Sequence, residues 1–150
     1  MKRVDLSVAV TAHNEGIIAH KTILSLFAAV KKLEEKNISY EFLVHIDNGD
    51  EETINYFKQY EKNKKFRIFQ NHFGDLGSSR NFLSQNADGE CIAFLDADDL
   101  VSANWLITAY ETLKNSKQEA VVHPEAVLNF GLDVPSVLTI QKGSRDKKDD

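Results

Sequence analysis

The sequence contains one cysteine, no long apolar run and no excess of positive charge. The single cysteine, Cys91, excludes an intramolecular disulfide and fits a reducing compartment. No apolar run approaches the ~20 residues that cross a membrane, and the N-terminus does not form a signal peptide. The net charge of −5 argues against nonspecific nucleic-acid binding, which needs a basic face. We therefore expect a cytoplasmic protein with no transmembrane segment and no nucleic-acid partner.

Three common ligand signatures are also missing. The five histidines do not have the spacing of a metal-binding pair. Gly74 and Gly77 form neither a dinucleotide-binding Gly-x-Gly-x-x-Gly motif nor a P-loop. An EF-hand loop counted from Asp96 would need Gly and Glu where the sequence has Val101 and Ile107. A histidine metal site, a Walker-type site and a calcium loop are therefore poor explanations of this chain.

A chain of 150 residues suits a single domain, in which short apolar runs alternate with segments of helical apolar spacing. We predict strands over residues 6–10, 40–46, 66–69 and 91–95, and a further strand that begins at 120–122 and can run on beyond Pro124. We predict helices over 17–36, from about 53, over 78–83 and over 104–114. This alternation favours an α/β sandwich with a largely parallel central sheet. We expect the domain to cover residues 1–135 and the charged segment 136–150 to be a disordered tail.

The most informative stretch is an apolar run that ends in three carboxylates, Asp96, Asp98 and Asp99. Burying carboxylates is costly, and clustering them adds like-charge repulsion. Hard oxygen ligands at this spacing suit Mg²⁺ or Mn²⁺, which commonly bridge a carboxylate and substrate phosphates. We therefore predict a metal–phosphate site at the carboxyl end of a central strand. The alternative is a helix N-cap with surplus charge, because acids favour helix starts.

Two more polar clusters, Thr11–Glu15 and Asp47–Glu52, follow the first and second predicted strands. In open parallel sheets, ligands bind beyond the carboxyl ends of the strands, at the point where the strand order reverses. The three clusters are separate in sequence but would converge at that edge. We therefore expect them to form one site.

Four segments resemble, in the same order, motifs of the inverting family 2 glycosyltransferases, which use nucleotide-sugar donors and have the GT-A fold, a Rossmann-like three-layer sandwich. These segments are Leu6–Glu15 for the opening strand and turn, Ile46–Asp50 for the Asp-Asp-Gly-Ser turn, Leu76–Asn81 for the Gly-x-x-x-Arg-Asn helix start, and Phe94–Asp99 for the Asp-x-Asp signature. The resemblance covers about residues 4 to 130. Asn48 and Asp50 depart from the usual Asp and Ser of the second motif.

The resemblance implies a nucleotide-sugar-binding site. Thr11, His13 and Glu15 would line the pocket for the base and the ribose. Asp47 would accept a hydrogen bond from a uracil-like N–H, which a carboxylate can do. Arg80 would either lie near the donor phosphates or hold the aspartate cluster in place, since its planar fork suits both.

The Asp-x-Asp segment carries the metal part of the implied site. Asp96 would contact the ribose or a metal-bound water, Asp98 would coordinate the metal, and Ala97 between them belongs to the same nucleotide-sugar-binding set. Both aspartates are therefore predicted metal ligands, with Mn²⁺ or Mg²⁺ as the cofactor. The metal would offset the charge that builds on the leaving nucleoside diphosphate.

The implied activity is transfer of a sugar, with inversion, from a UDP-linked donor to a hydroxyl acceptor, as in polysaccharide synthesis. The catalytic base is not identified, because residues 131–150 hold no counterpart of the family's downstream base. Two alternatives stay open. One is a noncatalytic nucleotide-sugar-binding module, which the missing base favours. The other is a phosphatase in which Asp96 attacks phosphorus and Asp98 is the general acid, although that pair normally follows the first strand.

Overall fold

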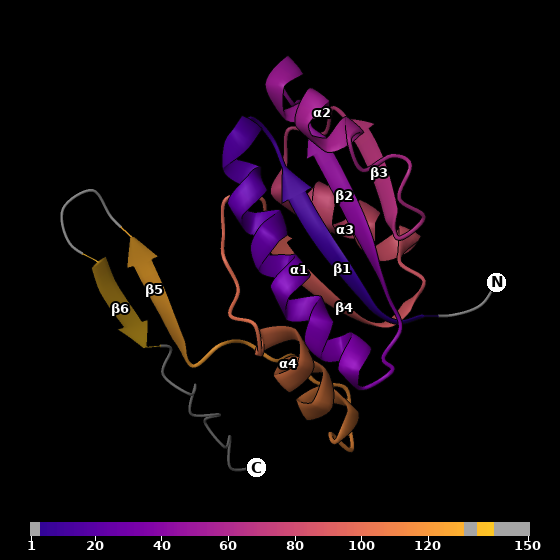
Figure 1. The fold of residues 1–150 in the computed structure, drawn as a ribbon, viewed down its shortest axis with the longest axis vertical. Helices are drawn as coiled ribbons and strands as arrows, with labels where there is room; N and C mark the ends of the chain where they lie inside the picture. The colour runs from indigo at the N-terminus through magenta and orange to yellow at the C-terminus, as the bar shows by residue number, and fades with distance from the viewer. Residues whose placement is uncertain (1–3, 131–134, 140–150) are drawn as a thin grey trace, which may run out of the picture.

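The computed structural model describes residues 4–130 and 135–139 and contains a four-stranded parallel sheet in the order β3-β2-β1-β4 (Figure 1). The strands are β1 Val4–Ala12, β2 Tyr40–Asp47, β3 Phe66–Asn71 and β4 Gly89–Asp96. The helices are the short 3₁₀ helix η1 Gly16–Ile18, α1 Ala19–Glu35, α2 Glu51–Lys58, α3 Leu76–Asn86 and α4 Trp105–Lys114. The predicted alternation of strands and helices is confirmed. The strand order reverses at β1, because β2 and β3 follow on one side of it and β4 lies on the other.

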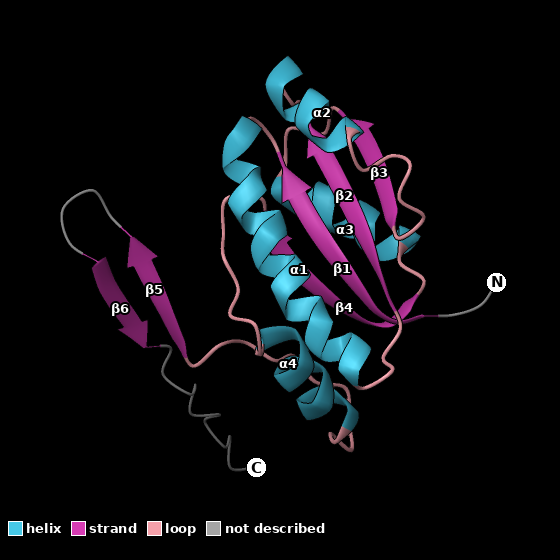
Figure 2. Ribbon diagram, viewed as in Figure 1, coloured by secondary structure: helices cyan, strands magenta, loops and turns pink. Residues whose placement is uncertain are grey.

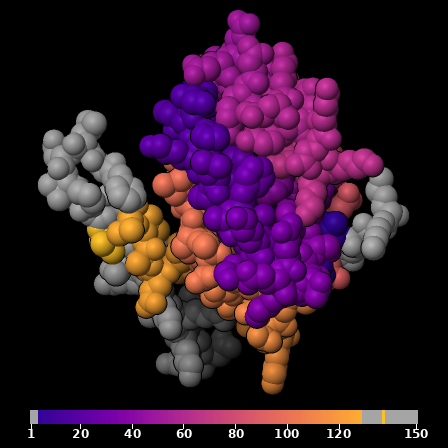
Figure 3. All heavy atoms as spheres, in the orientation of Figure 1, coloured from indigo at the N-terminus to yellow at the C-terminus, as the bar shows by residue number. Residues whose placement is uncertain are grey.

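The helices form a layer on each side of the sheet. α1, α2 and α4 lie on one face and α3 lies on the other (Figure 2). The space-filling view shows α1 and α2 covering much of the near face (Figure 3). The larger core lies under this layer, where Ile23, Leu26 and Leu33 of α1 are fully buried against β1 and β2. These residues repeat at helical spacing, which explains why this sequence forms a helix with one apolar side.

The helices α2 and α3, which follow β2 and β3, begin at aspartate caps. Asp50 accepts a hydrogen bond from Thr53 N at the start of α2, and Asp75 accepts one from Ser78 N at the start of α3. These bonds lower the pKa of both carboxyls. A cap fixes where a helix begins, so each aspartate also fixes the length of the turn that precedes its helix.

The structure corrects the prediction of a central buried strand at 91–95. β4 pairs only with β1 and is therefore an edge strand of the described sheet, with Phe94 40% exposed. Its free side faces a groove lined by β4, α4 and residues 118–122. An apolar run in the sequence indicates that helices cover the faces of a strand. It does not indicate whether the strand has a neighbour on both edges. Cys91 packs against the core as predicted and its pKa is raised by burial.

The C-terminal part differs from the sequence expectation in two ways. Residues 120–122 form no strand; a hairpin follows instead, with β5 Ala126–Phe130 antiparallel to β6 Pro135–Thr139 (Figure 1). The predicted tail therefore overlaps β6, and the rest of it, residues 140–150, lies outside the described residues. Pro124 lies between the apolar residues 120–122 and β5, which is consistent with an interrupted strand. Within the described ranges, we find no helix with the length and apolar character to cross a membrane.

Candidate functional site

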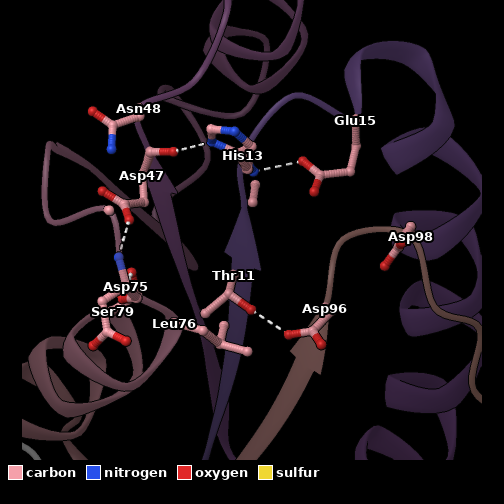
Figure 4. A pocket seen from close by; sticks show the side chains of 12 residues that line it. Thr11, His13, Glu15, Asp47, Asn48, Asp75, Leu76, Ser79, Asp96 and Asp98 are labelled. Atoms are coloured by element: carbon pink, nitrogen blue, oxygen red, sulfur yellow. Dashed lines mark hydrogen bonds between the residues drawn. The ribbon is translucent and has the colours of Figure 1, made fainter.

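A pocket of about 390 Å³ opens at the carboxyl ends of β1, β2 and β4 (Figure 4). Its lining comes from the three strand ends, from the loop before α3 and from the start of α3, and most of it is polar residues: Thr11, Ala12, His13, Glu15, Asp47, Asn48, Gly74, Asp75, Leu76, Ser79, Asp96 and Asp98. The size is within the range of small-molecule sites. The three sequence clusters therefore converge as predicted.

At the base of the pocket, Asp96 is held by both of its neighbours. Thr11 Oγ1 donates to Asp96 Oδ1 at 2.5 Å, and Arg80 Nη2 lies 3.0 and 3.2 Å from the two carboxylate oxygens. β1 and β4 are in register so that Thr11 and Asp96 are direct partners, while Arg80 reaches across from α3. Arg80 therefore contacts the aspartate cluster, as one of its two predicted roles requires. Oδ1 therefore accepts two hydrogen bonds, whereas Oδ2 accepts one and keeps a lone pair for a ligand.

Asp98 and Asp99 follow in the turn after β4. Asp98 is exposed, lines the pocket, and makes no hydrogen bond or ion pair with any other described residue. Burial first, and then the charges of Asp98 and Asp96, raise the pKa of Asp99. The turn is therefore a concentration of negative charge in which Asp98 presents an unused carboxylate to the pocket.

Asp47 at the end of β2 organises the opposite wall. Its Oδ1 accepts from Phe73 N at 2.6 Å. Its Oδ2 accepts from Asp75 N at 3.2 Å (Figure 4). The carboxylate thereby holds the loop between β3 and α3 against the end of β2. Since each carboxylate oxygen has two lone pairs, Asp47 can still accept from a ligand.

The turn after β1 forms the rim between these walls. Glu15 Oε2 accepts from His13 N at 2.6 Å, and His13 Nδ1 donates to the Asp47 carbonyl at 2.5 Å. Figure 4 shows His13 lying between Glu15 and Asp47. His13 and Glu15, both predicted site residues, therefore line the pocket and also link the turn after β1 to the end of β2.

Not every predicted residue reaches the pocket. Ala97 is fully buried, donates its N–H to the Thr11 carbonyl and accepts from Thr22 Oγ1 of α1, so it holds the strand end in place and does not line the pocket. Arg80 pairs with Asp96 and is likewise absent from the lining. The sequence analysis missed Asp75 and Ser79. Asp75 is a residue type preferred at helix N-caps, which could have indicated that α3 begins directly after it.

A buried histidine supports the loop that Asp47 holds. His45 on β2 is fully buried, its Nε2 bonds Asn71 Oδ1 at 3.0 Å, and its ring stacks on Phe73 at 5.2 Å. Phe82 of α3 packs on the same ring. Burial lowers the pKa of His45 because an imidazolium would lose its hydration there.

We expect this burial to make stability depend on pH. Above the usual histidine pKa of about 6.5, His45 is neutral in both states and its contribution to stability is complete. Below that value the unfolded chain binds a proton that the folded protein does not, so stability falls as pH decreases toward the lowered pKa. His45→Phe keeps an aromatic ring beside Phe73 and cannot be protonated. Urea unfolding across this pH range should give a shallower decline for His45→Phe than for the wild type; equal declines would contradict the assignment.

The family model of glycosyl transferase family 2 matches residues 7–130. The chain belongs to this family. Poly(ribitol-phosphate) beta-N-acetylglucosaminyltransferase TarP of Staphylococcus aureus (strain N315) is 28% identical over 151 residues, which cover 99% of this chain and 44% of TarP. The resemblance to family 2 glycosyltransferases that the four sequence motifs indicated is thereby confirmed.

Solved structures of this fold agree with the arrangement described above. S. aureus TarS 1–349 in complex with UDP superimposes with a TM-score of 0.63 and 20% identity, covering 81% of this chain and 39% of that chain. The complex with UDP-GlcNAc gives 0.63 and 20%, covering 81% and 38%. At this identity the likeness shows the fold, which is the GT-A sandwich expected from the sequence. The chain spans less than half the length of these family 2 relatives.

Proposed function

We propose that this chain forms the donor-binding part of an inverting glycosyltransferase that transfers a sugar from a UDP-linked donor to a hydroxyl acceptor with the help of a divalent metal. The observation that carries the proposal is the pocket in which Asp47, Asp96 and Asp98 meet at the carboxyl ends of three parallel strands. Membership of glycosyl transferase family 2 supports the reaction class.

In this proposal the two walls of the pocket hold different parts of the donor. The Asp47 carboxylate accepts the N–H of the uracil ring, and Thr11, His13 and Glu15 surround the base and ribose. The fixed Asp96 faces the ribose and the diphosphate from the other wall. The protein orients the donor so that the acceptor oxygen bonds to the anomeric carbon on the face opposite the departing UDP, which gives inversion.

The carboxylates of the pocket are suitable ligands for a divalent cation that also binds the phosphates of the substrate. Within the described residues, no three Asp, Glu, His or Cys side chains are arranged to hold a metal by themselves. Asp98 offers an unpartnered carboxylate beside Asp96, and Mg²⁺ or Mn²⁺ is commonly held by one or two carboxylates together with substrate phosphates. Such a cation supplies charge neutralisation at the diphosphate.

UDP-GlcNAc is the first donor to test. The TarS structures contain UDP and UDP-GlcNAc, and the name of TarP describes N-acetylglucosamine transfer to a poly(ribitol-phosphate). We propose the same donor for the present chain, acting in the cytoplasm.

Calorimetric titration of UDP with and without Mn²⁺ tests the donor site. We expect Mn²⁺-dependent binding that is at least about tenfold tighter with the metal, a difference of about 1.4 kcal/mol. GDP is the matched control, because its guanine ring does not offer Asp47 the same N–H and should bind more weakly. Equal binding with and without Mn²⁺ would contradict the metal, and no binding of UDP to the folded protein would contradict the donor site. Release of phosphate from an aryl phosphate would instead favour the phosphatase alternative.

A further inference from the structure

The turn after β1 is tied to the turn after β2 by a chain of three hydrogen bonds. Asp50 N donates to Asn14 Oδ1 at 2.8 Å, and Asn14 Nδ2 bonds His13 Nε2 at 3.0 Å. His13 Nδ1 in turn bonds the Asp47 carbonyl at 2.5 Å. We call this chain the Asn14–His13 relay. Its two ends are the first and last residues of the turn 47–50.

The chemistry of the end groups fixes the direction of every bond in the relay. A backbone N–H can only donate and a backbone carbonyl can only accept. Asn14 therefore accepts from Asp50 through its oxygen and has only its NH₂ group left for His13. His13 Nε2 must then be the acceptor and Nδ1 must carry the proton. The relay is complete only with a neutral imidazole in the Nδ1–H form.

The turn that the relay spans has little room to adjust. Asn48 adopts a positive φ of 51°. A Cβ on Gly49 would lie 2.2 Å from Ile46 Cγ2 and 2.9 Å from the His13 carbonyl oxygen. The two turns are therefore in close contact, and side chains bridge them on both sides of that contact. Asp47, at one end, is the residue that fixes the opposite wall of the pocket.

We propose that Asn14 is a positioning residue that acts through His13. By donating to Nε2, it keeps His13 in the Nδ1–H form, and the pair holds the turn 47–50 where the nucleoside end of the donor needs it. The identity of the ligand rests on the proposed function. The prediction that His13 carries its proton on Nδ1 does not depend on it. Asn14 itself does not line the pocket, so sequence motifs for ligand contact would not single it out.

Asn14→Asp separates the two halves of the relay. An aspartate still accepts from Asp50 N but can no longer donate to His13, so Nε2 should gain a proton while Nδ1 keeps its own. The Glu15 and Asp50 carboxylates, which lie near His13, are the same in both proteins and do not account for the difference. Asn55→Asp is the matched control, because it adds the same charge on an exposed position of α2.

Long-range ¹H–¹⁵N correlation NMR of the ¹⁵N-labelled chain reads the ring nitrogens directly, with His13→Gln used to assign the His13 signals. In the wild type we expect a protonated Nδ1 and an unprotonated Nε2. In Asn14→Asp we expect the signature of a ring that is protonated on both nitrogens. Asn55→Asp should match the wild type. A wild-type ring protonated on Nε2 would overturn the proposal. If Asn14→Asp does not fold, Asn14→Ala removes the donor without adding charge, and the Nε2 signal should move away from its hydrogen-bonded position; an unchanged Nε2 signal would contradict the contact.

Titration with UDP and Mn²⁺ tests the positioning role. Asn14→Asp should bind about tenfold more weakly, equivalent to about 1.4 kcal/mol, while Asn55→Asp binds as the wild type does. An unchanged affinity in a variant whose His13 has changed its protonation would overturn the role of Asn14. Failure of the wild type to bind UDP would instead contradict the proposed function, and the NMR result would still decide which nitrogen carries the proton.

Discussion

Replacing Asp98 with asparagine should abolish Mn²⁺-dependent UDP binding and leave the stability of the fold unchanged. Asp98 is exposed and makes no hydrogen bond or ion pair within the described residues, so no packing or pairing is lost. Its carboxylate lines the pocket beside Asp96, and an amide is a much weaker ligand for a hard cation. Because loss of an outer-shell partner typically costs 10- to 100-fold in metal affinity, loss of a ligand should weaken UDP binding by about 100-fold or more.

Calorimetry with Mn²⁺ measures this loss, and thermal unfolding of the same samples measures stability. Asp99→Asn is the matched control, because it removes the same charge from the next residue, which does not line the pocket. Its UDP affinity should fall by less than about threefold, since only a screened neighbouring charge is removed. The assignment of Asp98 fails if its variant binds UDP with wild-type affinity and metal dependence. It also fails if Asp99→Asn loses as much affinity as Asp98→Asn.

The order of the elements could be predicted from sequence because each element carries its own periodicity. The bounds were less predictable: β1 extends to Ala12 and α3 to Asn86, beyond the apolar residues that indicated them. The edge position of β4 was not predictable, because it depends on which strands pair and not on the apolar run itself. The last predicted strand was placed too early, because the apolar residues before Pro124 gave its signal, and its antiparallel partner β6 was missed.

The candidate site was predictable where it follows strand ends. Parallel strands bring their carboxyl ends to one edge, so Thr11, Asp47 and Asp96 converge whatever the details of the loops. The part built from the start of α3 was not predictable. Its position depends on the loop after β3 folding back, through hydrogen bonds from Phe73 and Asp75, onto the Asp47 carboxylate. Those bonds use backbone donors, which leave no signature in the sequence.

The face of the sheet beneath α3 has polar groups at both ends and a small apolar cluster between them. At the carboxyl ends of the strands, Arg80 of α3 pairs with Asp96. At the amino ends, Arg67 of β3 donates to the Asn86 carbonyl of α3 and pairs with Glu41. The polar contacts at the two ends of α3 therefore add to the apolar packing of Leu83 and Phe82 between them. Function is proposed at one end, and the other end should therefore serve stability alone.

Glu41→Ala should lower the free energy of unfolding by about 3 kcal/mol, the largest stability effect that we predict. Glu41 is buried, and its Oε1 accepts from Ser7 Oγ and from Asp88 N, both at 2.7 Å. Breaking a buried ion pair costs about 3–5 kcal/mol. The lower end applies here, because the Arg67 side chain is 37% exposed and water can replace its partner.

Urea unfolding at neutral pH measures the effect of Glu41→Ala, with Glu35→Ala as the control. Glu35 pairs with Lys32 on the exposed side of α1, at side-chain exposures of 60% and 43%, so its loss should change stability by less than about 0.5 kcal/mol. Because Glu41 lies at the end of the sheet opposite the pocket, the folded Glu41→Ala protein should bind UDP as the wild type does. A large loss of UDP affinity in folded protein would show that α3 transmits changes from its C-terminus to Arg80 and Asp96. A stability within about 1 kcal/mol of the wild type would show that solvent already satisfies the groups around Glu41.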